Sequence, residues 1–191
     1  INFKSNEIIG KLPLFATTKE GYKNLTRLSS KSYLEIDKMS DPHCKLKELS
    51  SYNKDLILLS GNHHHLLGKL FKLNKLKELK NILIYLKDIF DDRFYIEIQR
   101  HNEVGENLYE NFLLELSEKL AIPLIASQEI YYINKDMHQA HDALICIGEK
   151  NIIDDPKRLK YSDQHYFKNK KEIEELFKDI PEALENNYNF P

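Results

Sequence analysis

Residues 93 to 132 contain the pattern that most restricts the fold of this chain, two apolar segments separated by one amphipathic segment. Residues 93 to 99 are rich in Phe, Tyr and Ile, which favours a strand. Residues 106 to 120 repeat apolar positions at helical spacing, and residues 123 to 126 form a short apolar run that is typical of a strand buried on both faces. A strand, a helix and a strand in this order predict a right-handed crossover between parallel strands.

The same alternation extends back to the start of the chain. Apolar runs at residues 12–16 and 55–60 are each followed by polar or helical segments. We therefore expect neighbouring parallel strands at 12–16, 55–60, 93–99 and 123–126, with helices on their outer side, in an α/β layer or barrel. Four strands are too few to close a barrel, so the missing strands are expected before Ile1.

Apolar spacing also predicts the helices. Thr17 or Thr18 can cap a helix that follows the first strand. Further helices are expected at residues 45–53, 63–90, 106–120, 136–149, 170–178 and 181–188. The side chains expected to face inward include Tyr22, Leu25, Leu28 and Tyr33 in the first helix, and Met137, Ala140, Leu144, Ile145 and Ile147 in the helix at 136–149. Residues 37–44 are predicted to be a polar connector that Pro42 interrupts.

Composition excludes several classes of protein. The net charge of -2 gives no bulk attraction to nucleic acid or to anionic membranes, although a local basic patch remains open. Two cysteines, Cys44 and Cys146, provide no disulfide framework and favour a reduced, cytoplasmic setting. No apolar run approaches the roughly 18 residues of a membrane span, and no secretory signal is present. The chain opens at Ile1 and closes as a helix ends, so we interpret both ends as cuts through a longer polypeptide.

Three adjacent histidines, His63, His64 and His65, are the first candidates for a site. Adjacent side chains on a helix point about 100° apart, so the three cannot all face one metal ion from a helix. One interpretation is that they form the exposed, polar start of a helix. The alternative is that one of them belongs to a site, and His63 is the best candidate because it lies beside the strand end. His138 and His141 share a helix face but lack a visible third ligand, which favours a packing or capping role.

Polar side chains at two strand ends are better placed. His101, Glu129 and Tyr131 each lie within a few residues of the end of a predicted strand, at the sheet edge where parallel folds place their sites. A neutral imidazole there can bind zinc or manganese, and a solvated loop histidine is an equal alternative. Glu97 and Gln99 lie on the polar face of their strand, which points into a site or makes structural hydrogen bonds.

Five stretches of sequence, taken in order, resemble one protein family. They are residues 20–25 (EGYKNL), 56–61 (LILLSG), 95–101 (YIEIQRH), 140–147 (AHDALICI) and 180–186 (IPEALEN). Together they resemble the bacterial replicative DNA polymerase III alpha subunit, in its amino-terminal PHP (polymerase and histidinol phosphatase) domain. The resemblance covers nearly the whole chain. It implies a distorted, TIM-like, seven-stranded β/α barrel that is incomplete here, with residues 1–150 as the barrel segment and 151–191 as an extension toward the polymerase palm.

The resemblance also implies where the family's metal pattern falls. His101 matches the histidine of a Gln-Arg-His stretch. The family's Asn-Asp-x-His strand end falls on residues 128–131, where Glu129 replaces Asp and Tyr131 replaces His. Asn62 stands where metal-binding relatives often have Cys, and the family's His-x-His strand and Asp-His motif are absent. The prediction is a vestigial metal site at His101, Glu129 and Tyr131, with no catalytic residue.

Three functions remain open. The favoured one is a structural and docking domain of a polymerase chain, with no tightly bound cofactor; magnesium would serve the full polymerase, and DNA would bind through the full-length chain. Expected partners are other polymerase III subunits, including the proofreading exonuclease subunit. The second is an active metal-dependent PHP phosphoesterase that uses zinc or manganese, and the third is an unrelated α/β ligand-binding domain. The sequence before Ile1 and after Pro191 would discriminate among them.

Overall fold

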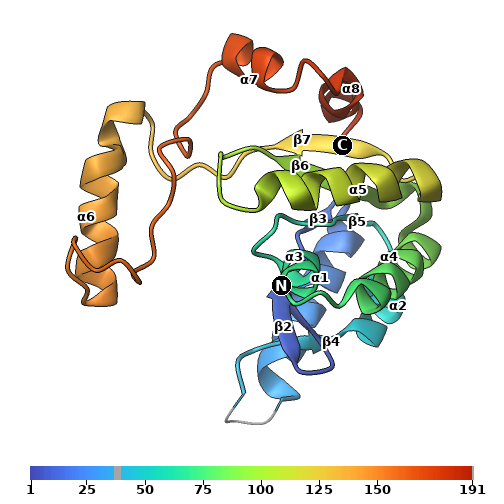
Figure 1. Cartoon of the computed structure of the whole chain (residues 1–191). Helices are drawn as coiled ribbons and strands as arrows, with labels where there is room; N and C mark the ends of the chain where they lie inside the picture. Colours follow the sequence, from blue (N-terminus) through green and yellow to red (C-terminus); the bar gives the residue numbers. More distant parts are fainter. Residues whose placement is uncertain (37–39, 191) are drawn as a thin grey trace.

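Two small sheets, flanked by helices, make up the computed structural model, which describes residues 1–36 and 40–190 (Figure 1). The strands are β1 (Asn2–Ser5), β2 (Ile8–Lys11), β3 (Leu14–Ala16), β4 (Cys44–Lys45), β5 (Leu56–Leu59), β6 (Phe94–Gln99) and β7 (Leu124–Ser127). The α-helices are α1 (Lys19–Leu34), α2 (Leu49–Tyr52), α3 (Leu66–Lys72), α4 (Leu76–Phe90), α5 (Glu106–Leu120), α6 (His138–Glu149), α7 (Lys170–Leu176) and α8 (Pro181–Asn189). Short 3-10 turns are η1 (Leu46–Glu48), η2 (Asp91–Arg93) and η3 (Lys135–Met137). Of the predicted connector at 37–44, residues 37–39 lie outside the described residues.

The crossover predicted from residues 93 to 132 is confirmed. β6 pairs in parallel with β7, with Ile96 opposite Leu124, and α5 connects the two strands. β5 pairs in parallel with β6 on the other side. Leu56, Leu58 and Ile96 have no exposed surface, which explains why these strands appear in the sequence as almost continuous apolar runs.

The expected direction of the first strand is wrong, because β3 pairs antiparallel with β5. A parallel β5 would require the connection to return the chain to the end of the sheet at which β3 begins. Instead, α1 leads away from the sheet and the next segment leads back to it. The N–H of Thr17 donates to the Asp55 carbonyl at 3.0 Å, and the N–H of His43 donates to the Ser32 carbonyl at 3.1 Å. The connection therefore begins and ends at the same edge of the sheet, and β5 runs against β3.

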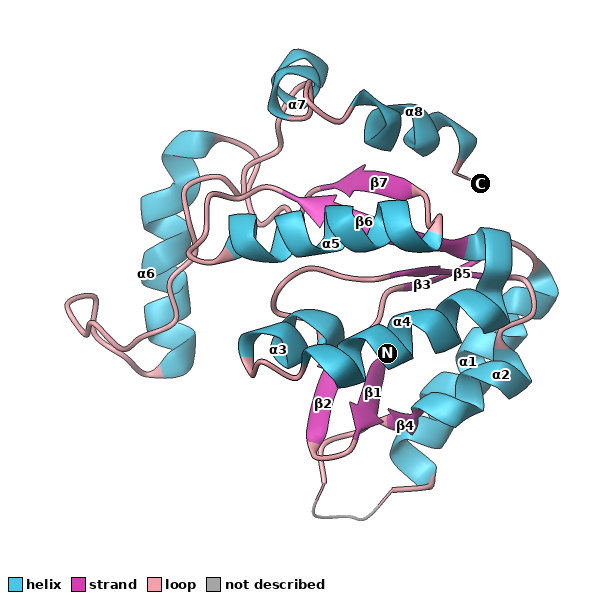
Figure 2. Ribbon diagram, turned by 45° about the vertical axis from the view of Figure 1, so that its right-hand side comes forward, coloured by secondary structure: helices cyan, strands magenta, loops and turns pink. Residues whose placement is uncertain are grey.

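The predicted TIM-like barrel is not confirmed; the described residues form an open sheet. Its order is β3-β5-β6-β7, so β7 is an outer strand. The side-chain amides of Asn186 and Asn187 in α8 donate to the Leu124 and Ala126 carbonyls of β7 at 2.7 and 2.9 Å. These side chains use hydrogen-bonding positions that the next strand of a barrel would need. Figure 2 shows α8 beside β7.

The second sheet, in the order β2-β1-β4, was not predicted. β1 and β2 form an antiparallel hairpin whose turn includes Asn6 at a left-handed φ of 49°. The strands are short and the turn lacks glycine, so neither periodicity nor turn composition indicated a hairpin. The sheet nevertheless contributes buried residues, including Phe3 and Cys44, to the main apolar core.

Apolar spacing predicted the helices better than it predicted their burial. Thr18 caps α1 as expected, and Leu28 is buried, but Tyr22 is 65% exposed. In α6 only Cys146 is fully buried, and Leu144 is 64% exposed. The expectation of an inward apolar face on α6 is therefore wrong; this helix stands apart from both sheets (Figures 1 and 2).

Cys44 and Cys146 are both buried free thiols. Within residues 1–36 and 40–190, no helix combines the length and the apolar character needed to cross a membrane.

Candidate functional site at the strand ends

One buried asparagine, Asn62, joins the carboxyl ends of β5, β6 and β7. Its side-chain amide donates to the Gln99 side-chain carbonyl at 3.0 Å and to the Glu129 carboxylate at 3.4 Å. Its own side-chain oxygen accepts the backbone N–H of His64 at 3.0 Å, which folds residues 62–64 into a tight turn before α3. Because the three strands are parallel, their ends meet at one edge, and Asn62 bonds across all of them.

His101, the first residue predicted for the site, is enclosed, with 2% of its surface exposed. Its Nε2 accepts the backbone N–H of Glu129 at 3.1 Å, and its Nδ1 lies 3.7 Å from the Glu106 carboxylate. Glu106 also accepts the backbone N–H of His101 at 2.8 Å. Since Nε2 accepts a hydrogen bond, the neutral imidazole carries its proton on Nδ1, beside the Glu106 carboxylate, and neither nitrogen presents a free lone pair to a metal ion in this arrangement.

Stacked rings cover His101. His165 lies parallel to it, with 4.0 Å between ring centroids, and Tyr131 stacks on His165 at 4.9 Å. Burial, and then a hydrogen bond with Tyr161, raises the pKa of Tyr131 above its usual value. The phenol therefore keeps its proton at neutral pH and is a poor metal ligand. The structure brings the three predicted residues together, but the His101 ring nitrogens face other partners and the protonated Tyr131 hydroxyl is a poor ligand.

Glu103, which the sequence did not single out, contacts three histidines. Its Oε2 lies 2.9 Å from the Nε2 of His63 and 2.7 Å from the Nε2 of His64, and its Oε1 lies 3.1 Å from the Nε2 of His165. The ligand atoms of His63, His64 and Glu103 all lie within 4.8 Å of one another. Among the described residues this is the one group of three His, Cys, Asp or Glu side chains with that proximity.

Two carboxylates, Glu103 in the loop before α5 and Glu106 at the start of α5, are fixed acceptors. Burial acts to raise the pKa of Glu103, but hydrogen bonds from His165, His63 and His64 outweigh it and hold the pKa far below its usual range. Burial opposes ionisation of Glu106 as well, and hydrogen bonds from His101 lower its pKa overall. Both side chains are therefore ionised at neutral pH and orient the histidines around them.

Glu97 has a different environment. Its Oε1 accepts hydrogen bonds from the Ser127 hydroxyl and, at 2.9 Å, from the Gln99 amide. Its Oε2 meets no hydrogen-bond partner among the described residues, and burial raises the pKa of the carboxyl. Glu97 therefore links the ends of β6 and β7 by structural hydrogen bonds.

A cavity of about 290 Å³ opens beside the Glu103 cluster. It is lined by Asn2, Lys11, Asn62, His64, His65, Lys69, Glu103, Glu129, Tyr131, Leu159, Lys160 and Tyr161. Burial lowers the pKa of His65 to about 4, so this imidazole is neutral at physiological pH. Acidic, basic and imidazole groups together make this cavity the candidate functional site.

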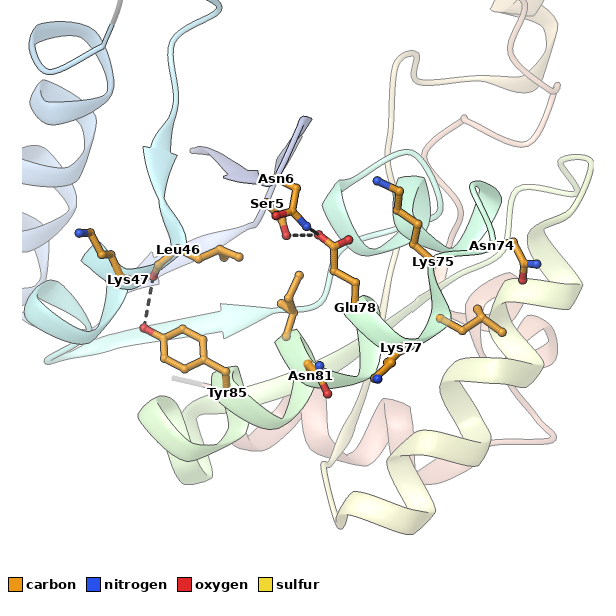
Figure 3. Close-up of a pocket in the computed structure, with 12 residues that line it drawn as sticks. Ser5, Asn6, Leu46, Lys47, Asn74, Lys75, Lys77, Glu78, Asn81 and Tyr85 are labelled. Carbon is orange, nitrogen blue, oxygen red and sulfur yellow. Dashed lines mark hydrogen bonds between the residues drawn. The ribbon is translucent and has the colours of Figure 1, made fainter.

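A larger cavity, of about 750 Å³, lies elsewhere, between the β1–β2 turn and α4 (Figure 3). Its one carboxylate, Glu78, accepts hydrogen bonds from the Ser5 hydroxyl and, at 2.8 Å, from the Asn6 amide. Its other lining residues are lysine, asparagine, tyrosine and aliphatic side chains. The larger volume would favour this cavity as a binding site, but the histidine and carboxylate side chains that could bind a metal ion lie beside the smaller cavity at the strand ends.

The expectation that the three adjacent histidines start a helix is wrong, whereas the alternative that His63 belongs to a site stays a prediction; Glu103 and His165 were not singled out from the sequence. Residues 63–65 precede α3, which begins at Leu66, so the helical argument against convergence does not apply. The Gly61-Asn62 pair before them, a frequent turn former, was the signal that could have placed them in a turn. His138 and His141 pack against Tyr132, as the packing alternative for this pair required.

Comparison with known proteins identifies the relatives of this chain. The family model described as PHP domain matches residues 3–101. DNA polymerase III subunit alpha of Rickettsia bellii is 36% identical over 182 residues, and that of Borreliella burgdorferi is 35% identical over 188. The corresponding protein of Caulobacter vibrioides is 33% identical over 175 residues. These alignments cover 95, 96 and 92% of this chain, which spans 15 to 16% of the length of the relatives.

Proposed function

The chain belongs to the PHP domain family, and from that membership we propose that it forms the PHP segment of a DNA polymerase III alpha subunit and serves DNA replication in a structural and docking role. The single observation that supports this role is that His101 and Tyr131, at the strand ends, are not available as metal ligands. His101 uses both ring nitrogens within the chain, and the pKa of Tyr131 is raised. These residues do not fit a metal centre, so they act as structural supports of the domain.

The proposal assigns DNA synthesis to other parts of a longer polypeptide. Nucleotidyl transfer requires carboxylates that hold two metal ions. The one candidate ligand group among the described residues contains a single carboxylate, Glu103. In this proposal the magnesium ions and the DNA are bound by the full-length polymerase, and residues 151–191 lead from segment 1–150 toward the palm.

The proposed partners are other subunits of the replicative polymerase, the proofreading exonuclease subunit among them, and the proposed compartment is the cytoplasm. Leu144 and Ile147, three residues apart on one face of α6, are exposed apolar side chains, and we take this face as the candidate docking surface. The proposal of a structural role predicts a folded domain that binds a partner and has no turnover of its own.

Two assays test this role. In the first, the purified chain is incubated with primed template, deoxynucleotides and magnesium; no primer extension is expected, and extension above a buffer control would contradict the proposal. In the second, the chain is mixed with the exonuclease subunit of the same organism and analysed by size-exclusion chromatography. Co-elution is expected from the wild type and loss of co-elution from the double variant Leu144→Ser, Ile147→Ser. The control is Leu34→Ser, which replaces an apolar side chain on α1 that is 81% exposed. Co-elution that is unaffected by the α6 substitutions would remove α6 from the docking surface.

The alternative function, an active PHP phosphoesterase, predicts hydrolysis of a generic phosphoester that depends on strand-end ligands. Such enzymes hold two or three metal ions with several histidines and carboxylates. Turnover that is abolished by His101→Ala, in protein with near-stoichiometric zinc or manganese, would favour the enzyme over the structural domain.

A further inference from the structure

We propose that His63, His64 and Glu103 bind one divalent transition-metal ion, for which zinc is the best match. Two imidazole nitrogens and one carboxylate oxygen are a donor set that zinc accepts, with water in the fourth position. Magnesium prefers oxygen ligands and six-fold coordination, which this group does not offer. The site shares no residue with the predicted group of His101, Glu129 and Tyr131. It also departs from the sequence-based expectation that the segment binds no metal tightly.

The geometry requires only a small adjustment. The Nε2 atoms of His63 and His64 lie 2.9 and 2.7 Å from Glu103 Oε2, which are hydrogen-bond distances. Ligand atoms around a tetrahedral zinc ion stand roughly 3.3 Å apart, given zinc–ligand bonds of roughly 2.0 Å. An ion that takes the place of the shared protons therefore needs the atoms to separate by roughly half an ångström. His64 is 51% exposed in its side chain and is free to make that movement.

Backbone structure directs both imidazoles at the same carboxylate. The Asn62 side chain accepts the N–H of His64 and closes the turn, and the two rings lie with centroids 3.9 Å apart. Gly68 lets α3 approach this turn, because a Cβ at that position would lie 2.3 Å from the His63 carbonyl carbon. A turn, unlike a helix, allows adjacent side chains to converge.

An outer hydrogen bond orients the carboxylate. His165 contacts Glu103 Oε1 at 3.1 Å through its Nε2 and the Glu129 carbonyl at 3.0 Å through its Nδ1. The Oε2 atom thus remains directed at His63 and His64. Outer partners of this kind raise metal affinity, and their loss typically costs about 10 to 100-fold.

Lys72 acts against the metal ion. Its ammonium lies 3.4 Å from the Nδ1 of His64 and places a positive charge beside the site. If the Nδ1 of His64 accepts a hydrogen bond from Lys72, the neutral ring carries its proton on Nε2. That proton must move to Nδ1 before Nε2 can ligate the ion. Removing this charge is expected to strengthen metal binding, an effect that a purely structural role for the histidines does not predict.

The test compares zinc binding among variants by equilibrium dialysis with mass spectrometry, and by the visible absorption of cobalt(II) as a geometry probe. The wild type is expected to bind about one ion per chain and to prefer zinc to magnesium. Loss of the exposed ligand in His64→Ala should weaken zinc binding by at least about 10-fold, Glu103→Gln should weaken it similarly, and Lys72→Met should strengthen it. His43→Ala, which removes a histidine that contacts the Asp41 carbonyl away from the site, is the matched control.

Circular dichroism of each variant establishes that the fold is intact, and the exposed position of His64 keeps the test valid if Glu103→Gln unfolds. Equal zinc affinity in the wild type and His64→Ala would overturn the proposal. So would metal binding that is lost only in His101→Ala, which would place the ion at the strand ends. Magnesium bound as tightly as zinc would overturn the assignment of the metal class.

Discussion

Helices α4 and α6 look alike in the sequence and differ in the structure. Both repeat apolar residues at helical spacing, and α4 buries Leu79, Ile82, Leu83, Leu86 and Phe90 against the sheets. α6 buries Cys146 and leaves Leu144 and Ile147 largely exposed. Helical periodicity therefore shows which residues share a face, but not whether a second surface covers that face.

The difference extends to the regions around these helices, which we call the body (the described residues 1–132 and 164–190) and the arm (residues 133–163). The body surrounds one large apolar cluster that includes Leu83 and Phe94. That cluster includes no residue of the arm among the described residues. Within the arm, His138 contacts the Tyr161 carbonyl at 3.1 Å and Arg158 pairs with Asp142 at 2.6 Å, and His138 and His141 pack against Tyr132 of the body. Apolar burial therefore stabilises the body, whereas the arm depends on hydrogen bonds, ion pairs and a few aromatic contacts.

The largest expected effect is a difference in the free energy of unfolding between two leucine-to-alanine substitutions, one in α4 and one in α6. Leu83→Ala in α4 deletes a side chain with no exposed surface, and should lower the free energy of unfolding by about 2 to 5 kcal/mol. Leu144→Ala in α6 removes a side chain that is 64% exposed, and should change it by less than about 0.5 kcal/mol. Urea titration followed by circular dichroism measures both. A similar loss in the two variants would show that the α6 face is covered.

The next effect concerns an ion pair inside the body. Arg100 pairs with Glu110 at 2.5 Å and with Asp179 at 2.6 Å, and its guanidinium lies over the Phe177 ring. Arg100→Ala leaves Glu110 without its partner and should destabilise the protein by about 2 kcal/mol. The control is Lys119→Ala, which breaks an exposed pair with Glu115 and should cost less than about 0.5 kcal/mol. Equal denaturation midpoints for Arg100→Ala and Lys119→Ala would contradict this ranking.

A smaller effect, of opposite sign, comes from a polar atom in the core. The Tyr109 hydroxyl is buried and meets no hydrogen-bond partner among the described residues. Burial, and then the charge of Glu97, raises the pKa of Tyr109. Tyr109→Phe removes an unsatisfied group at nearly constant shape, so stability should stay the same or rise by up to about 1 kcal/mol. A clear decrease in the thermal midpoint would show that the hydroxyl has a partner.

The smallest effect belongs to the arm and depends on pH. A hydrogen bond from Arg158 lowers the pKa of Asp142 in the folded protein below its unfolded value. The pair therefore stabilises the arm above the unfolded pKa of about 4, and the contribution is lost as pH falls through the lower, folded pKa. Asp142→Asn should destabilise the arm by at most about 1 kcal/mol at pH 7, and the effect should diminish as the pH falls below about 4.

Amide hydrogen exchange in α6 measures that local stability, with amides of α4 as an internal reference. Asp142→Asn should speed exchange in α6 at pH 7 and leave α4 unchanged. If α4 and α6 respond together, the body and the arm unfold as one unit, and the comparison between them fails.

Local sequence predicted those parts of the fold that depend on neighbours along the chain. Residues 56–59, 94–99 and 124–127 are strands because their apolar side chains are continuous, and Thr18 caps α1 because its hydroxyl accepts the Gly21 N–H. The direction of β3 was not predictable in this way. It depends on the path of the chain between Ala16 and Leu56, and a strand carries no local signal of its direction.

The candidate site shows the same limit. His101, Glu129 and Tyr131 could be placed at one sheet edge because the crossover between β6 and β7 determines where these strands end. Contacts such as that between Glu103 and His165 join residues far apart in the sequence, and no periodicity indicates them. That the strand-end set is the vestige of a metal site stays a prediction, whereas the proximity of its residues is a structural fact.

The two asparagines of α8 also cover an outer strand through which copies of this protein would otherwise pair. A free outer strand is a template onto which another chain can add its own strand, and repeated addition leads to aggregation. Asn186 and Asn187 occupy the carbonyl groups of β7 that such a strand would pair with. Helix α8 therefore shields β7 from strand pairing, and loss of the two amides is expected to lower solubility at high concentration before it lowers the stability of a single molecule.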